Sequence, residues 1–137
     1  MGHIHIGFAN PDDNMAIDLV RYMDLYLGVP SVIMDSDLLR KKVYGTAGRF
    51  RITSYGVEYR VLSNFWLASE ELMRWAFSQT QEAIKAYNRN LNIEESQGLI
   101  LNCINNSNTL LAEQLIKQFK LKTTTETWQN KTEKELV

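Results

Sequence analysis

Two short segments in which polar and apolar residues alternate constrain the fold more than any other feature of the sequence. The first covers residues 3–8 (His-Ile-His-Ile-Gly-Phe), and the second covers residues 57–62 (Val-Glu-Tyr-Arg-Val-Leu). Successive side chains of a strand point to opposite faces of a sheet, so alternation is typical of a strand with one buried face. Each segment therefore predicts a strand with an apolar face and a face that carries ionisable groups.

Capping and breaking residues predict helices around these strands. A helix is expected over residues 13–27, and Gly28 followed by Pro30 is expected to end it. The apolar residues 29–34 predict a strand or a buried connection. Residues 35–43 begin with acids and end with bases, which suits the dipole of a short helix.

From Ser69 onward, apolar residues recur at helical spacing and predict helices over residues 69–89, 93–105 and 108–119. The sequence thus predicts an α+β fold, in which a partial antiparallel sheet packs with a C-terminal helical segment. We expect one domain over residues 1–121, with strands and loops in 1–65 and helices in 66–121, followed by a loose polar tail over 122–137.

Composition excludes several classes of protein. The chain has 137 residues, of which 45% are apolar and 23% charged, as expected for one soluble globular domain. A net charge of -1 gives no basic field that would attract nucleic acid. No stretch of ~18 apolar residues could span a membrane. A lone cysteine and the lack of a secretory signal favour the cytoplasm, which is the host cytoplasm if a phage encodes the chain.

Some residues that could carry chemistry are better explained as core. Cys103 lies in an apolar helical stretch without a histidine near it in the sequence, so it is expected to be buried rather than nucleophilic. Three aromatic residues stand where helix packing would place them, and we expect them in the core: Trp66, Trp75 and Phe77.

His3 and His5 are candidates for a binding role. On a strand they point to the same side, ~6–7 Å apart, and two imidazoles can share a metal ion or a phosphate-bearing ligand. The alternative is a solvated strand edge, which needs no ligand.

Glu58 and Arg60 also share one face of a strand. A carboxylate can bind a hard cation, and a guanidinium can grip a phosphate or a carboxylate. A plain salt bridge is the alternative. Residues 44–51 predict a loop with two glycines, and Arg40, Arg49 and Arg51 flank these glycines; such a loop could steady phosphates or could be only a basic surface.

In this order, the segments 2–7, 40–51 and 55–63 resemble the phage-encoded COOH–NH2 ligases. These amidoligases belong to the superfamily of glutamine synthetase and glutamate-cysteine ligase. The resemblance is close over the first half of the chain. Over the remainder, the chain is similar to the family only in its general helical character. It implies half of a glutamine-synthetase-like catalytic fold. The implied reaction uses ATP to phosphorylate a carboxylate, and an amine then attacks the acyl phosphate to give an amide.

The resemblance also implies roles for single residues. His3 and Glu58 would hold a catalytic Mg2+ beside the phosphates of ATP. His5 would face the substrate carboxylate or the acyl phosphate, and Arg60 would contact substrate or phosphate. The remaining arginines are the candidates for binding the phosphates of ATP: Arg40, Arg49 and Arg51. The implied partners are ATP, a carboxylate and an amine.

One part of the superfamily pattern is absent. The N-terminal half of the fold supplies further metal-binding carboxylates, commonly a Glu-x-Glu pair, whereas this sequence starts at the histidine strand. Glu70-Glu71 and Glu94-Glu95 stand at helix starts, where acids match the dipole. An unpaired strand edge needs a partner. We therefore expect a homo-oligomer, a second chain that supplies the missing strands, or a remnant that keeps the fold without the chemistry.

Two other function classes stay open. The chain could be a non-catalytic phage-derived protein that keeps the ligase fold and engages a host protein through residues 72–87. It could also bind nucleic acid, although the net charge disfavours this function. Five basic residues would make the contacts: Arg40, Lys41, Lys42, Arg49 and Arg51.

Overall fold

The computed structural model describes residues 3–8, 10–35 and 46–124. The short helix expected over residues 35–43, with Arg40, falls almost entirely outside these ranges. Most of the expected tail, residues 125–137, also lies outside them.

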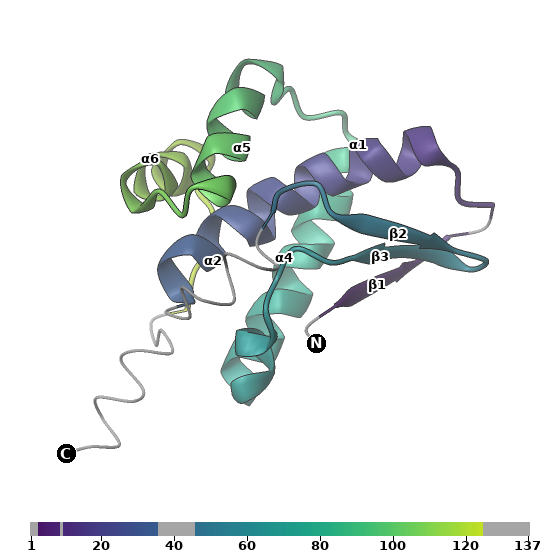
Figure 1. Cartoon of the computed structure of the whole chain (residues 1–137), viewed down its shortest axis with the longest axis horizontal. Helices are drawn as coiled ribbons and strands as arrows, with labels where there is room; N and C mark the ends of the chain where they lie inside the picture. Colours follow the sequence, from purple (N-terminus) through teal and green to yellow (C-terminus); the bar gives the residue numbers. More distant parts are fainter. Residues whose placement is uncertain (1–2, 9, 36–45, 125–137) are drawn as a thin grey trace.

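The fold is α+β, as predicted. A small antiparallel sheet holds β1 (Ile4–Gly7), β2 (Phe50–Thr53) and β3 (Gly56–Tyr59), in the order β1-β3-β2. Helix α1 (Asp13–Met23) crosses the sheet and packs on α4 (Glu70–Asn88), while α5 (Gln97–Asn105) and α6 (Thr109–Phe119) stand at the other end (Figure 1). Strands β1 and β3, far apart in sequence, are neighbours because the chain returns to the sheet after α1.

The register gives the sheet one apolar and one polar face. On the apolar face, Ile4 lies opposite Tyr59 and Ile6 lies opposite Val57. The central strand β3 is buried along its whole length, and its Val57 and Tyr59 are fully buried. The apolar face therefore joins the core, and the predicted alternation of faces is confirmed in both strands, although β3 ends at Tyr59 and not at Leu62 as predicted.

The predicted end of the first helix at Gly28 and Pro30 is wrong. The helix continues from α1 through a π-helical turn, η1 (Asp24–Gly28), into α2 (Val29–Met34), so residues 29–34 form a largely buried helix and not a strand. Pro30 lies in the first turn of α2, where a missing N–H is tolerated. Every residue from Asp24 to Pro30 is buried, and this tertiary burial outweighs the local breaking signal.

The back half is helical, as predicted, and α4 and α6 begin at side-chain caps. The hydroxyl of Ser69 accepts a hydrogen bond from the backbone N–H of Leu72 at 3.1 Å, and the side chain of Asn108 accepts one from Leu111 at 3.1 Å. Two short 3-10 turns precede α4 and α5: η2 (Asn64–Ala68) and η3 (Glu94–Ser96).

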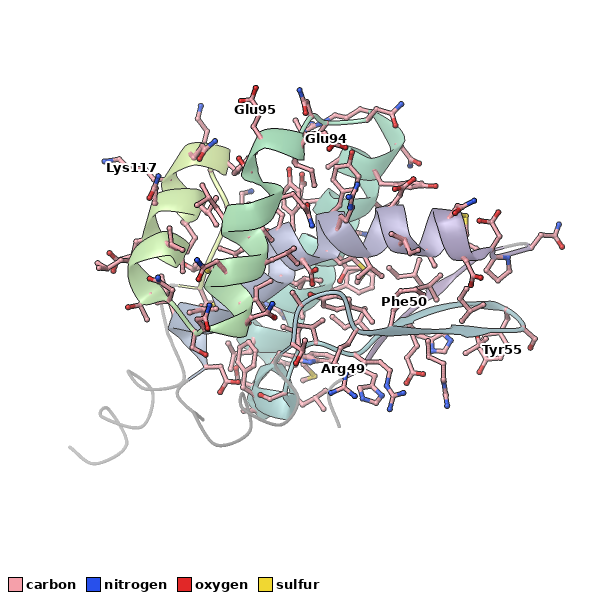
Figure 2. The ribbon with its side chains drawn as sticks, turned by 45° about the horizontal axis from the view of Figure 1, so that its top comes forward. Arg49, Phe50, Tyr55, Glu94, Glu95 and Lys117 are labelled. Atoms are coloured by element: carbon pink, nitrogen blue, oxygen red, sulfur yellow. The ribbon has the colours of Figure 1, made fainter. Side chains whose placement is uncertain are left out.

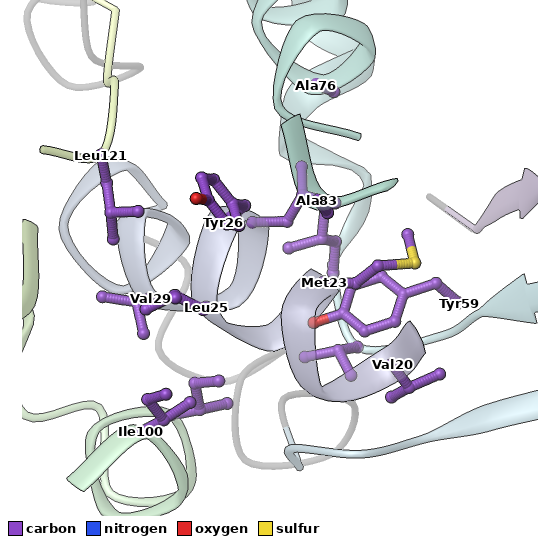
Figure 3. Packing of buried hydrophobic residues seen from close by; sticks show 14 of the residues in the cluster. Val20, Met23, Leu25, Tyr26, Val29, Tyr59, Ala76, Ala83, Ile100 and Leu121 are labelled. Carbon is purple, nitrogen blue, oxygen red and sulfur yellow. The ribbon is translucent and has the colours of Figure 1, made fainter. Parts of the chain in front are cut away.

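The core draws on both halves of the chain. Tyr59 of β3 lies beside Met23 and Val20 of α1 (Figure 3). The helix that runs from α1 through η1 into α2 also passes Ala83 of α4. Cys103 and Trp75 are buried, as predicted, and Trp66 is half-buried. The prediction for Phe77 is wrong: it is 69% exposed, because the buried stripe of α4 runs along its other face. No helix in the described residues is long and apolar enough to cross a membrane.

Gly56 permits the close pairing of β1 and β3, and this gives a test of the fold. A β-carbon at Gly56 would overlap the carbonyl oxygen of Ile6, which is backbone and cannot turn away. We expect Gly56→Ala to lower the free energy of unfolding by on the order of 2–3 kcal/mol in urea titrations. Gly98→Ala in α5 is the matched control, because a β-carbon there meets no atom within 4 Å. It should stabilise the chain by about 0.5–1 kcal/mol, and equal effects at both sites would contradict the register.

Candidate functional site

The polar face of the sheet brings together the residues that the sequence singled out. His5 of β1, Glu58 of β3 and Arg51 of β2 form one cross-strand row in the register. The ladder extends by one step, since the N–H of Arg60 donates to the carbonyl of Arg49 at 3.0 Å. Because directly opposite residues share a face, Arg49 and Arg60 belong to the same side. Figure 2 shows Arg49 and Phe50 on opposite sides of the ribbon.

Glu58 is the centre of this face. Its Oε1 lies 2.6 Å from Nδ1 of His3, and its Oε2 lies 2.9 Å from a terminal nitrogen of Arg51. An ionised carboxylate only accepts hydrogen bonds, so Nδ1 of His3 carries the proton, and Nε2 faces away from this bond. His3 is thus joined to Glu58 diagonally across the strands.

Electrostatics keep Glu58 ionised. Glu58 is only 8% exposed, and burial alone would raise the pKa of its carboxyl. The hydrogen bond from His3 and the positive charges of Arg51 and Arg60 outweigh burial and lower the pKa below its ordinary value. The carboxylate is therefore a permanent negative charge in a basic surrounding.

His5 lies on the same face but does not contact Glu58. It is exposed, and its Nε2 lies 3.3 Å from the hydroxyl of Thr53. Its ring stacks on Tyr55, with centroids 5.0 Å apart and planes 20° from parallel. The register puts His5 directly opposite Glu58, yet this stacking turns the imidazole toward the β2–β3 turn. His5 is free of the ion-pair network and accessible to a ligand.

Arg60 is half-buried, and its Nε atom is buried without a hydrogen-bond partner. A buried donor left without an acceptor costs about 1–3 kcal/mol. This makes Arg60 a candidate for binding an anion. Arg51 differs, since its side chain is 61% exposed and can turn from Glu58 toward a ligand.

Sequence reasoning missed Asp24, which supports the site from behind. Asp24 lies in the π-helical turn and is 1% exposed, and its Oδ1 accepts a hydrogen bond from the hydroxyl of Tyr59 at 2.7 Å. The backbone N–H of Gly48 also donates to it. Burial raises the pKa of Asp24 to about 7 despite these two hydrogen bonds. The available signal was a carboxylate inside the apolar run Tyr-Met-Asp-Leu-Tyr-Leu at residues 22–27.

The donors suit Mg2+ only together with phosphate. Among the described residues, no group of three or more histidine, cysteine, aspartate or glutamate side chains could hold a metal ion. Mg2+ in nucleotide sites is held by one or two carboxylates, with substrate phosphates and water completing its oxygen shell. Glu58 fits that pattern as a single protein oxygen ligand, with His3 beside it.

Comparison with known families decides the relationship. The family model described as phage phiEco32-like COOH.NH2 ligase-type 2 matches residues 1–132. The chain belongs to this family. The resemblance expected from the sequence is confirmed, and the match extends over the helical half, where the sequence pattern carried little. No curated protein and no solved structure matches the chain.

For this phage ligase-type chain, the raised pKa of Asp24 predicts a pH-dependent stability. Between pH 4 and pH 7 the folded chain holds a proton on Asp24 that the unfolded chain releases, since the ordinary pKa is 3.8. Stability contributed by Asp24 therefore falls as pH rises through this window, by up to about 1.4 kcal/mol per pH unit, and levels off above about pH 7. Asp24→Asn should remove this slope in denaturation curves. Asp18→Asn, at an exposed site of α1, is the control, and identical curves for both variants would refute the role of Asp24.

Proposed function

We propose that this chain is an ATP-dependent carboxylate–amine ligase, or the part of one that carries the phosphate-binding face of its sheet. The observation that supports the proposal best is the polar face itself. One ionised carboxylate, Glu58, stands there among two histidines and several arginines, in a member of a COOH–NH2 ligase family. A purely structural salt bridge would need only one of these basic side chains.

Glu58 would supply the protein oxygen ligand of Mg2+. His3 would hold this carboxylate through its Nδ1–H and would reach the ion itself only if that hydrogen bond breaks, because Nε2 lies on the far side of the ring. When bound, the ion would neutralise phosphate charge and polarise the transferred phosphoryl group. The hydrogen bond to Glu58 fixes the tautomer and the ring orientation of His3. The lowered pKa of Glu58 keeps the carboxylate ready for a cation across the physiological range.

The arginines would bind the anionic parts of the reactants. Arg49 and Arg51 are proposed to face the phosphates of ATP, and Arg40, which lies outside the described residues, is proposed from the sequence alone. Arg60, with its unpartnered Nε, would hold the substrate carboxylate or the acyl phosphate. Guanidinium groups are suited to both ligands, because their paired N–H donors match two oxygens at once.

The reaction has two displacements. An oxygen of the substrate carboxylate bonds to the γ-phosphorus of ATP, and ADP leaves with the electron pair of the broken P–O bond. The amine nitrogen then bonds to the acyl carbon, phosphate leaves with the electron pair of the C–O bond, and the nitrogen loses a proton. His5 is proposed to contact the carboxylate or acyl phosphate, since it is exposed on the same face. Positioning and charge stabilisation supply most of the catalysis in such a reaction.

Assembly and location stay proposals. The sheet has an open outer edge on β1 and another on β2 among the described strands, which supports self-association or pairing with a second chain. We also propose a cytoplasmic setting, where ATP and reduced thiols are available. The alternative function is a non-catalytic binding protein of phage origin that engages a host protein, and exposed Phe77 on α4 is the observation that favours it.

The proposal predicts that nucleotide binding depends on Glu58 in opposite ways with and without Mg2+. In calorimetry with Mg2+ and ATP, Glu58→Ala and His3→Ala should each weaken binding at least tenfold. Without Mg2+, Glu58→Ala should bind ATP as tightly as the wild type or more tightly, because a negative charge beside the arginines is gone.

Glu95→Ala is the matched control, since Glu95 is exposed and lies at the far end of the view from Arg49 (Figure 2). It should change neither affinity. A wild-type chain without affinity for ATP, or a Glu58→Ala variant that binds Mg2+ and ATP as the wild type does, would overturn the ligase proposal.

A further inference from the structure

The outer edge of β1 carries unpaired backbone groups. The N–H of Phe8 donates to the carbonyl of Tyr55 at 3.0 Å, which places Phe8 in a hydrogen-bonded pair with the strand beside it. Such pairs alternate along an antiparallel ladder, so Ile4 and Ile6 also face β3 with their backbone groups. The backbone N–H and C=O of His5 therefore point away from β3. In the described part of the chain no strand lies on that side.

A groove runs along this edge. It has a volume of about 320 Å³, and one wall is formed by three consecutive residues at the start of the β1 segment, His3, Ile4 and His5. The other wall comes from the helical half, with Trp66, Met73 and Phe77 among its residues. Because consecutive strand residues line it, the groove follows the backbone of β1 instead of ending in one side-chain pocket.

The helical wall exposes large apolar side chains. Met73 and Phe77 are four residues apart on α4 and so lie on the same side of the helix, and they are 39% and 69% exposed. Burying an exposed phenylalanine or methionine side chain stabilises a complex, because apolar surface is removed from water. This wall can therefore bind an apolar partner, while the strand wall offers hydrogen bonds.

The two walls together fit an extended polypeptide better than a compact ligand. A strand added to β1 would satisfy the backbone groups of His5 and send alternate side chains to opposite faces. One set would meet Met73 and Phe77. The other set would emerge on the polar face beside His3. There, the guanidinium groups of Arg51 and Arg60 outnumber the single carboxylate of Glu58, so this set should be acidic.

We propose that the groove binds an extended peptide with alternating apolar and acidic side chains, by strand addition to β1, and that an acidic side chain of this peptide is the carboxylate substrate. The added strand would lie ~4.8 Å from β1, so its acidic side chains would emerge next to His3 and His5, on the same face of the sheet as Glu58 and Arg51. The carboxylate oxygen would take the γ-phosphoryl group from ATP with loss of ADP, and an amine would then displace phosphate. The substrate role rests on the proposed ligase function, whereas the docking does not.

Docking is tested with a fluorescein-labelled peptide of alternating glutamate and valine, titrated against the full chain and followed by anisotropy. We expect saturable binding, and at least tenfold weaker binding of the same peptide with its alternate backbone nitrogens methylated, because methylation removes the donors of the ladder. Phe77→Ser should also weaken binding about tenfold. Phe77 is exposed, so this change should leave the fold intact.

Leu110→Ser is the matched control, since Leu110 is 77% exposed on α6, away from the groove. Absent binding, equal binding of the methylated peptide, or equal effects of the two serine variants would overturn the docking. So would a chain that dimerises in sedimentation and becomes monomeric on Phe77→Ser, because the occupant would then be a second copy.

Nucleotide calorimetry on the same samples separates the two proposals. Peptide binding by a chain without affinity for ATP would overturn the ligase function and leave the docking. Affinity for ATP without peptide binding would overturn the docking and leave the ligase function. Where both bind, adding ATP, Mg2+ and hydroxylamine should convert a glutamate of the peptide to a hydroxamate, detected by mass spectrometry. Binding without this conversion would overturn the substrate role alone.

Discussion

The hydrogen bond between Tyr59 and Asp24 is the interaction on which the arrangement of the site depends. It joins the central strand to the π-helical turn at the middle of the core, and the N–H of Gly48 joins the turn before β2 to the same carboxylate. Burying a carboxylate is costly, and the raised pKa of Asp24 records that cost. Glu58 is the neighbour of Tyr59 on the opposite face of β3, so fixing Tyr59 also fixes the position of Glu58.

The same contact explains why local signals for the end of a helix misled the prediction. A β-carbon at Gly28 would lie 3.1 Å from the hydroxyl oxygen of Tyr59 and 2.7 Å from a methyl carbon of Ile104. Gly28 therefore serves close packing within a helix, although in sequence it looks like a helix stop. Strands and caps were predictable because alternation and capping residues act locally. The π-helical turn and the exposure of Phe77 were not, since both depend on what packs against the helix.

The sequence predicted which described residues share the polar face, but not how these residues pair. The alternation along each strand was enough to place His3, His5 and Glu58 on the polar face. The strand order of the structure adds Arg51 to the cross-strand row of His5 and Glu58. Alternation does not say which imidazole reaches the carboxylate. His5 lies directly opposite Glu58 but stacks on Tyr55, and His3 forms the hydrogen bond instead. Such choices depend on side-chain rotamers and on the turn, which a single sequence does not specify.

The charge of the polar face decides what kind of ligand it can receive. Arg51 and Arg60 both act on the carboxylate of Glu58, whereas the whole chain has a net charge of -1, so the positive charge of this face is a local feature. A free divalent cation would meet repulsion from the arginines and only one anionic ligand. Phosphates or carboxylates that enter the face reverse this balance, because they neutralise the arginines and add oxygen ligands. This charge balance favours anions before a cation, and a cation becomes favourable only in their company, which agrees with the proposed ligase function.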